Sequence, residues 1–381
     1  MKKYSLIATT TFGLEAIVKR EIMNLGLEVT ATENGKVTFL GDAKDIVRAN
    51  IWLRCADRVL LKVAEFKAVT FDELFDKTKA INWSEFIPKN GRFPVDGQSV
   101  KSTLFSISDS QAIVKKAIVE NLKAKYKIAW FPENEGLYNV KVSILKDIAT
   151  LTIDTSGVAL HKRGYRQQAV TAPLKETLAS ALILLSFWNK DRVLIDPFCG
   201  SGTIPIEAAM IGRNIAPGLA REFAFKQWPI VSEDDFREAT REAYEAIDHD
   251  SEIKIYAYDI LEENVSAAIE NADEAGVLDC ITFEQKDFKD LVLSDDYSIM
   301  ITNPPYGERL SEKEEVDKLY QLIGDKIGKL KTWSSYIITS DKDFEKTFGK
   351  KADRRRKLYN GRIETTYYQF YGLNPKKEAA E

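Results

Sequence analysis

The sequence predicts an α/β protein whose C-terminal half is a doubly wound, mainly parallel sheet. Two observations carry this prediction. From about residue 170, apolar stretches of strand length alternate with longer segments of helical periodicity, the order that builds a parallel sheet covered by helices. The composition is that of a folded protein, since 44% of the 381 residues are hydrophobic and 29% are charged. This length predicts two or three domains.

The first 66 residues predict a smaller α/β unit. Asn34-Gly35 is a typical hairpin turn, and Gly26 follows a run of helical periodicity that it would end. The predicted order is strand, helix, strand, strand, helix, strand, which is that of a ferredoxin-like unit. The expected strands are Tyr4–Thr10, Leu27–Thr32, Lys36–Leu40 and Arg58–Ala64, and the expected helices are Leu14–Leu25 and Ala43–Arg54.

The remaining elements follow from the same two periodicities. Residues 67–155 predict helices at Phe71–Ala80 and Gln111–Tyr126, and strands at Ser99–Phe105, Tyr138–Leu145 and Asp147–Asp154. Further on, helices are expected at Pro173–Trp188, Thr203–Gly212, Asp234–Asp248, Glu262–Ala275 and Glu315–Leu330. Strands are expected at Arg192–Asp196, Lys254–Tyr258, Ile281–Gln285, Tyr297–Thr302 and Ser335–Thr339, with Thr365–Tyr371 as an antiparallel edge.

Composition excludes several classes of protein. Cys55, Cys199 and Cys280 are far apart and form no CxxC pair, which argues against a disulfide framework and a zinc site. The two histidines have no metal-binding spacing, so no metal is expected. The sequence contains no run of 18 apolar residues, so no membrane span is expected. The few cysteines fit a reducing cytoplasm. The net charge of −4 still allows a local basic patch to bind nucleic acid.

The first motif with chemical content is Asp-Pro-Phe-Cys-Gly-Ser-Gly-Thr at 196–203, between an apolar strand and a helix. Glycines let a backbone turn sharply and approach a ligand, and ligands of open α/β sheets bind at the carboxyl ends of strands. An acid at Asp196 suits a ligand with a positive ammonium group and is a poor neighbour for pyrophosphate. The motif resembles the S-adenosylmethionine loop of amino-group methyltransferases. Cys199 has no neighbouring histidine and is interpreted as a small loop residue.

Acids after the next two strands complete a predicted cofactor site. Asp259 ends the strand after the glycine loop, where an acid accepts hydrogen bonds from ribose hydroxyls. The spacing is longer than usual, because Asn214–Asp250 has the pattern of an insertion. Asp287 follows the third strand and could bind the adenine amine, while Phe288 could pack on the ring.

The segment Asn303-Pro304-Pro305-Tyr306-Gly307 is the most specific sign of the chemistry. The exocyclic amine of a base is a poor nucleophile, because its lone pair is delocalised into the ring. The side-chain oxygen of Asn303 and the carbonyl oxygen of Pro304 could accept its two N–H bonds and aim the lone pair at a methyl group. The two prolines stiffen the turn, and Tyr306 could stack on a base taken out of its helix. This scheme needs no separate general base.

Three basic stretches are candidates for contact with phosphates. The first lies in residues 350–362 and the second on the helix expected at 111–126. The third is His-Lys-Arg-Gly-Tyr-Arg at 161–166. The candidate RNA-binding residues are Lys115, Lys116, Arg163, Arg166, Arg354, Arg355, Arg356 and Lys357.

Together, HKRGYR, TAPLKETLASAL, DPFCGSGT, NPPYGERL and KLYNGRIE resemble the THUMP-domain RNA methyltransferases, most closely the bacterial group that methylates guanine N2 of 23S ribosomal RNA. The resemblance spans nearly the whole chain. It implies a ferredoxin-like domain at 1–65, an RNA-binding THUMP domain at 66–155, a linker and leading helix at 156–190, and a Rossmann-like methyltransferase domain at 191–375. It also implies S-adenosylmethionine as the cofactor and RNA as the partner.

Carried over by position, the resemblance implies roles for individual residues. Cofactor contacts fall on Asp196, Pro197, Phe198, Gly200, Gly202, Thr203, Asp259, Asp287, Phe288 and Thr171, and the target base on Asn303, Pro304, Pro305 and Tyr306. The favoured substrate is 23S ribosomal RNA or a ribosomal assembly intermediate, and a monomer is favoured. Two alternatives stay open. One is methylation of adenine N6 in DNA or RNA, or of guanine N2 in transfer RNA. The other is a non-catalytic RNA-binding protein.

Overall fold

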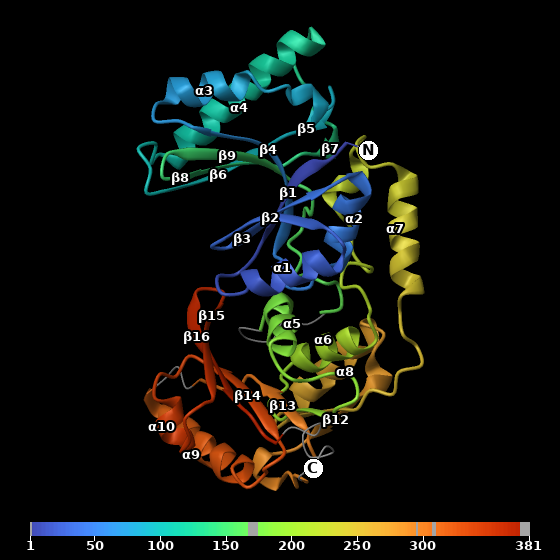
Figure 1. Cartoon of the computed structure of the whole chain (residues 1–381), viewed down its shortest axis with the longest axis vertical. Coiled ribbons are helices and arrows are strands. Elements are labelled where there is room, and N and C mark those ends of the chain that lie inside the picture. The colour runs from blue at the N-terminus through green and yellow to red at the C-terminus, as the bar shows by residue number, and fades with distance from the viewer. Residues whose placement is uncertain (1, 167–173, 295, 307–309, 374–381) are drawn as a thin grey trace. The chain divides into compact units, whose positions relative to one another are not determined.

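The computed structural model describes residues 2–166, 174–294, 296–306 and 310–373, and they form two compact units (Figure 1). The N-terminal unit contains residues 1–10, 19–160 and 221–242. The C-terminal unit contains residues 11–18, 161–220 and 243–381. Each unit therefore includes a segment that the order of the sequence would assign to the other.

The N-terminal unit is built on a seven-stranded sheet of order β2-β3-β1-β4-β9-β8-β6. Its first part has the ferredoxin-like order that the sequence predicts. The strands are β1 (Tyr4–Thr9), β2 (Glu28–Glu33), β3 (Lys36–Gly41) and β4 (Arg58–Lys67). The helices are α1 (Glu15–Asn24), whose start up to Val18 belongs to the C-terminal unit, and α2 (Ala43–Trp52). Asp42 caps α2 through a reciprocal pair of hydrogen bonds with Asp45, which explains why this helix begins where it does.

The second part of the same sheet carries two helices that pack on each other. Its elements are α3 (Phe71–Lys79), β6 (Val95–Val100), α4 (Ile107–Tyr126), β8 (Val140–Leu145) and β9 (Ile148–Asp154), with a small pair of strands, β5 (Gly91–Arg92) and β7 (Glu135–Leu137). The strand expected at Ser99–Phe105 is wrong. Lys101 adopts a left-handed φ of 51° that ends β6. Ser106 then caps α4 through Asp109 N, so that helix begins earlier than expected.

The insertion after the glycine loop packs in the N-terminal unit. The Trp228 ring stacks on Tyr138 with ring centroids 5.0 Å apart, and its Nε1 donates to Leu137 O at 2.9 Å. Phe225 N donates to Thr155 O at 3.1 Å. The segment holds the short helix η2 (Ala224–Gln227) and most of α7 (Glu233–Glu245). Sequence periodicity identifies the insertion but gives no sign of this destination.

The C-terminal unit is a seven-stranded, mainly parallel sheet of order β12-β11-β10-β13-β14-β16-β15. Its strands are β10 (Leu194–Asp196), β11 (Ile255–Asp259), β12 (Ile281–Gln285), β13 (Ile299–Thr302), β14 (Ser334–Thr339), β15 (Arg354–Asn360) and β16 (Ile363–Phe370). β16 is antiparallel to β14, as expected, but the edge is β15. Leu358 is the one fully buried residue of β15, so the apolar pattern of this strand is weak.

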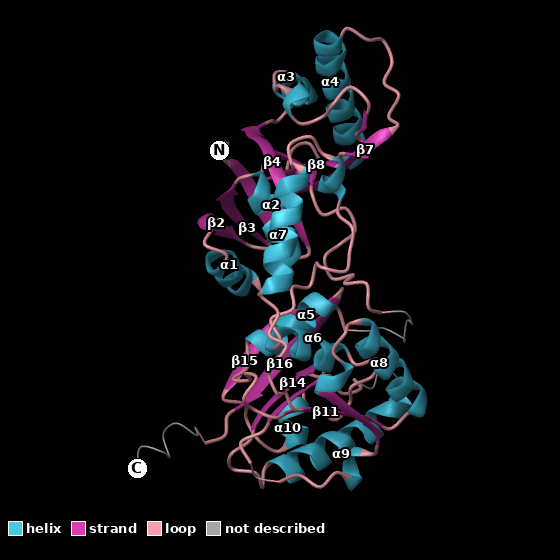
Figure 2. Ribbon diagram, turned by 90° about the vertical axis from the view of Figure 1, so that its right-hand side faces the viewer, coloured by secondary structure: helices cyan, strands magenta, loops and turns pink. Residues whose placement is uncertain are grey.

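Helices cover both faces of this sheet (Figure 2). On one face lie α5 (Glu176–Leu184), α6 (Thr203–Gly212) and α8 (Glu262–Glu274), and on the other α9 (Leu310–Ile327) and α10 (Phe344–Phe348). The α9 face is a buried cluster that includes Tyr320, Ile337 and Phe344. In the part of the chain that the structure describes, no helix is both long and apolar enough to cross a membrane.

Candidate active site

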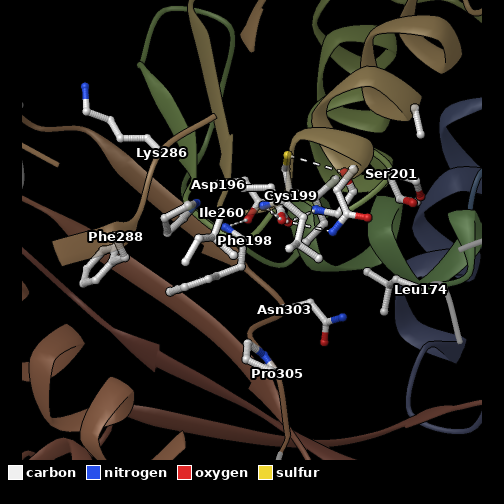
Figure 3. Close-up of a pocket in the computed structure, with 18 of the residues that line it drawn as sticks. Leu174, Asp196, Phe198, Cys199, Ser201, Ile260, Lys286, Phe288, Asn303 and Pro305 are labelled. Atoms are coloured by element: carbon white, nitrogen blue, oxygen red, sulfur yellow. Dashed lines mark hydrogen bonds between the residues drawn. The ribbon is translucent and has the colours of Figure 1, made fainter. Parts of the chain in front are cut away.

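A cavity of about 810 Å³ lies at the carboxyl ends of β10, β11, β12 and β13 in the C-terminal unit (Figure 3). Parallel strands deliver the loops that follow them to the same edge of a sheet, so residues distant in sequence meet there. Most of the residues predicted for the cofactor and target base line this cavity. They are Asp196, Pro197, Phe198, Gly200, Thr203, Asp259, Asp287, Phe288, Asn303 and Pro305.

The loop after β10 turns through two glycines with positive φ, Gly200 at 52° and Gly202 at 81°. A side chain at Gly202 would approach the Cβ of Ala268 to 3.0 Å, so this glycine lets α6 begin close to α8. Gly202 is not among the residues that line the cavity, so the structure gives it a turn and packing role, and its contact with the cofactor stays a prediction. Thr203, which begins α6, does line the cavity.

Asp196 is a buried acid with a free side toward the cavity. Its Oδ1 accepts hydrogen bonds from Thr302 Oγ1 at 2.6 Å and from Phe198 N at 3.2 Å. Burial is the largest of the influences that raise the pKa of Asp196 to about 7, and the nearby charge of Asp259 acts in the same direction, whereas the hydrogen bonds from Thr302 and Phe198 N oppose it. Within the described ranges no lysine or arginine forms an ion pair with it. A ligand that brings an ammonium group would therefore supply the missing positive charge.

Asp259 organises the glycine loop. Its Oδ2 accepts from Gly200 N at 3.0 Å, and its Oδ1 accepts from Leu261 N and Asn264 Nδ2, both at 3.0 Å. A carboxylate has about four acceptor positions, so one remains for a ligand hydroxyl. Asp259 thus fixes the loop and can still receive the ribose that the sequence assigns to it.

An aromatic wall lies beyond Asp259. The rings of Phe198 and Phe288 are 5.5 Å apart between centroids. Asp287 accepts from Lys289 N at 3.0 Å, and this bond is the largest of the influences that lower its pKa. An ionised acid beside an apolar ring surface fits an adenine amine. Lys286 also lines the cavity, beside Asp287.

The turn at 303–306 follows β13 and forms the opposite side of the cavity (Figure 3). Asn303 and Pro305 line the cavity, whereas Pro304 and Tyr306 are not among its lining residues. The Tyr306 hydroxyl donates to Asn303 Oδ1. Cys199 also lines the cavity, and burial raises the pKa of its thiol, which keeps it protonated.

The predicted role of Arg163 in RNA binding is wrong. Its side chain is 2% exposed and pairs with Glu207, which is fully buried. Tyr165 OH donates to Glu207 Oε1 at 3.2 Å, and Ser180 Oγ also donates to Glu207. A guanidinium enclosed in this way cannot reach a phosphate. The network instead connects Glu207 of α6 with α5 and with the segment that precedes α5.

Arg166 also has a structural role. Its Nη2 donates to Thr203 Oγ1 at 2.8 Å and to Leu174 O at 3.1 Å, and it pairs with Glu176. Leu174 and Thr203 both line the cavity, so Arg166 connects two of its walls. Thr171, which the sequence assigns to the cofactor, lies outside the described residues.

The other basic candidates remain accessible to different degrees. Arg354, Arg355 and Lys357 are exposed on the edge strand β15, while Arg356 is half-buried. On α4 Lys116 is exposed. Lys115 instead pairs with Glu133, and its Nζ lies 3.5 Å from the centroid of the Phe93 ring. Of this second stretch, Lys116 is therefore the better candidate for phosphate contact.

A buried acid without a cation partner and an Asn-Pro-Pro turn on one cavity of a doubly wound sheet define a Rossmann-like methyltransferase. Comparison of the sequence with family models agrees. The chain belongs to the RMKL-like methyltransferase family, whose model matches residues 163–369. Models of the RlmL ferredoxin-like domain and of the THUMP domain match residues 5–60 and 68–154. The protein is an S-adenosylmethionine-dependent RNA methyltransferase of this type.

Named relatives are similar over the whole chain. YpsC of Bacillus subtilis, whose name marks it as a candidate RNA methyltransferase, is 51% identical over 384 residues and is covered completely, as is this chain. The ribosomal RNA large subunit methyltransferase K/L of Syntrophotalea carbinolica is 35% identical over 378 residues. That match covers 95% of this chain and 53% of the relative, so this chain spans about half the length of that relative.

One solved structure is similar over almost the whole length of both chains. SMU.472, described as a candidate methyltransferase in complex with SAH, has a TM-score of 0.93 and 45% identity. The match covers 98% of this chain and 99% of that chain. SAH is the product left when S-adenosylmethionine gives up its methyl group, and the free side of Asp196 fits the ammonium group that both molecules carry.

Proposed function

We propose that the protein transfers a methyl group from S-adenosylmethionine to the exocyclic N2 of a guanine in 23S ribosomal RNA. The observation that carries this proposal is that Asn303 and Asp196 line one cavity. The acid suits the ammonium group of the cofactor, and the amide oxygen suits an amine to be methylated. Bound S-adenosylmethionine supplies an electrophilic methyl group on a sulfonium centre.

The residues of the chain divide the remaining work. We assign the methionine part of the cofactor to Asp196, Pro197, Phe198, Gly200 and Thr203. The ribose falls to Asp259, and the adenine to Asp287 with the Phe288 ring. These assignments use only acceptors and apolar surface that line the cavity, and the Phe198–Phe288 wall supports the placement of a flat ring.

Asn303 and Pro304 hold the target amine. Their two oxygens accept its two N–H bonds, which favours a tetrahedral nitrogen and stabilises the positive charge that develops on it. Asn303 Oδ1 already accepts from the Tyr306 hydroxyl. A carbonyl oxygen has two lone pairs, so Asn303 Oδ1 can accept from the amine as well, and we assign the Tyr306 ring to stacking on the base.

RNA recognition is assigned to both halves. The THUMP domain supports RNA as the partner, and relatives named for ribosomal RNA of the large subunit support that substrate class. Lys116 and the basic edge strand Arg354–Lys357 are the proposed phosphate contacts. The domain limits proposed along the sequence are 1–65, 66–155, 156–190 and 191–375, with the exchanged segments 11–18 and 221–242 packing in the other unit. We expect a monomer in the cytoplasm.

The test is a transfer assay with tritiated S-adenosylmethionine. The enzyme is offered total RNA from a strain that lacks it, assembling ribosomal particles, or DNA, and the labelled nucleosides are separated by chromatography. We expect label in N2-methylguanosine of 23S RNA. Label in N6-methyladenine or in transfer RNA would replace the substrate and keep the chemistry. Cofactor binding without label in any pool would favour a non-catalytic RNA-binding protein.

A further inference from the structure

A buried tyrosine on α9 holds the turn that carries Asn303. Tyr320 is 0% exposed, and its hydroxyl donates to Pro305 O at 2.9 Å. The same hydroxyl is 2.9 Å from Thr339 Oγ1, at the end of β14. Helix α9 thus contacts the backbone of the turn directly, and β14 contacts it only through the Tyr320 hydroxyl.

The direction of these bonds follows from counting protons. A tyrosine hydroxyl has one proton, and a carbonyl oxygen can only accept. Since Tyr320 donates to Pro305 O, it must accept from Thr339 Oγ1. Thr339 Oγ1 in turn accepts from Asp341 N at 3.1 Å. The result is a one-way chain from Asp341 N through Thr339 and Tyr320 to Pro305 O, in which each bond polarises the next.

The turn needs such support because of its own composition. Pro304 and Pro305 have no N–H, so the turn has two backbone donors fewer than an ordinary one. Pro305 O belongs to the Pro305–Tyr306 peptide. A bond to Pro305 O fixes the plane of that peptide, and with it where Asn303 and Tyr306 lie relative to each other.

We propose that Tyr320, oriented by Thr339, is a positioning residue that holds the Asn303–Tyr306 turn in the conformation needed for methyl transfer. The proposal rests on the proposed function, in which Asn303 and Pro304 hold the amine. Burial raises the pKa of Tyr320 and keeps its hydroxyl protonated, as a donor to Pro305 O requires. Neither Tyr320 nor Thr339 is among the residues that line the cavity.

The test is Tyr320→Phe, which removes one oxygen atom from a buried site. Tyr367→Phe is the matched control, because Tyr367 is also 0% exposed and its hydroxyl donates to Leu182 O at 2.9 Å, away from the turn. We expect Tyr320→Phe to lower kcat by about 10- to 100-fold, the loss that a small misplacement of reacting groups produces. The cofactor affinity of this variant by isothermal titration should stay unchanged, and Tyr367→Phe should keep the wild-type kcat.

A second readout needs neither cofactor nor RNA. Hydrogen–deuterium exchange of the peptide that contains residues 303–306 should be faster in Tyr320→Phe and unchanged in Tyr367→Phe. Thr339→Val should show the same faster exchange, Thr339→Ser should restore slow exchange, and the double variant Tyr320→Phe/Thr339→Val should lose no more kcat than Tyr320→Phe alone.

The outcomes separate this inference from the proposed function. Wild-type exchange and wild-type kcat in Tyr320→Phe would overturn the inference, as would an equal loss of kcat in Tyr367→Phe. If the wild-type enzyme labels no RNA while Tyr320→Phe still exchanges faster at the turn, the proposed substrate fails and the support of the turn by Tyr320 stands.

Discussion

The two sides of the cavity are held in different ways. The glycine loop is fixed by two carboxylates, Asp196 and Asp259, which accept N–H groups of Phe198 and Gly200 in the loop itself. The Asn303 turn has two prolines and is supported by hydroxyls, from Tyr306 within it and from Tyr320 on α9. The loop is thus built around the two carboxylates that we propose to bind the cofactor, whereas the turn is held by two hydroxyls, one of them from outside it.

The largest expected effect breaks the substrate side alone. Asn303→Ala should lower the rate of methyl transfer by about 100- to 1,000-fold, the usual loss when one preorganised transition-state contact is removed. Cofactor affinity by isothermal titration should stay close to wild type, because Asn303 is assigned to the base. Loss of cofactor binding in this variant would show that the division into two sides is wrong.

Asn264→Ala is the matched control for that experiment. Asn264 donates to Asp259 Oδ1, so its loss should loosen the cofactor side and weaken cofactor affinity. We expect the rate at saturating cofactor to fall much less than in Asn303→Ala. Opposite behaviour of the two asparagine variants would reverse the assignment of the two walls.

Asp196→Asn sharpens the comparison on the cofactor side. Removing the charge should weaken cofactor affinity by about 10- to 100-fold, the range for a hydrogen bond to a charged group. In the protein without cofactor, the same substitution should raise the stability of the fold at high pH. The pKa of Asp196 is raised by folding, so its contribution to stability is lost as pH rises from about 4 to about 7. Asp196→Asn should therefore have a higher Tm than wild type at pH 8, and an equal or lower value there would contradict the burial of an uncompensated charge.

The same group predicts how cofactor affinity depends on pH. Asp196 must be ionised to pair with an ammonium group, and burial raises its pKa to about 7. Affinity should therefore be constant above that pH and fall about tenfold for each pH unit below it. Titrations between pH 5.5 and 8.5 check this, and Asp196→Asn should give a weak, flat profile. A flat profile in the wild type would exclude Asp196 as the titrating partner.

The smallest effect concerns the RNA edge. Replacing Arg354, Arg355 and Arg356 by Gln should weaken RNA binding and reduce the slope of log affinity against log salt by roughly one for each phosphate that the protein no longer neutralises. Since Arg356 is half-buried, we expect a change closer to two than to three. Arg237→Gln, at an exposed position on α7, is the control and should leave the slope unchanged. A triple variant with the wild-type slope would remove β15 from the RNA path.

Sequence alone predicts what lies in continuous motifs. Asp196, Asp259 and Asn303 each stand at or just after the end of a strand, and the parallel order of those strands brings them together, so the cavity was predictable from local patterns. Gly202 was harder to interpret, because a glycine that allows close packing and one that contacts a ligand have the same sequence signature. Its neighbour Ala268 lies far along the chain.

Contacts that depend on distant partners escaped prediction. Arg163 stands in a basic stretch, and its buried pairing with Glu207, 44 residues away, gives it a structural role. Tyr320 has the spacing of an ordinary core residue of an amphipathic helix, and nothing local indicates that its hydroxyl reaches Pro305. The edge strand β15 was missed because its basic side chains hide the alternation that marks a strand.

The exchange of segments between the two units has a consequence for synthesis. The N-terminal unit needs residues 221–242, and the C-terminal unit needs residues 11–18. A growing chain therefore cannot complete its first unit until residue 242 has left the ribosome, after the glycine loop of the second unit has already emerged. No single cut in the chain yields both units whole.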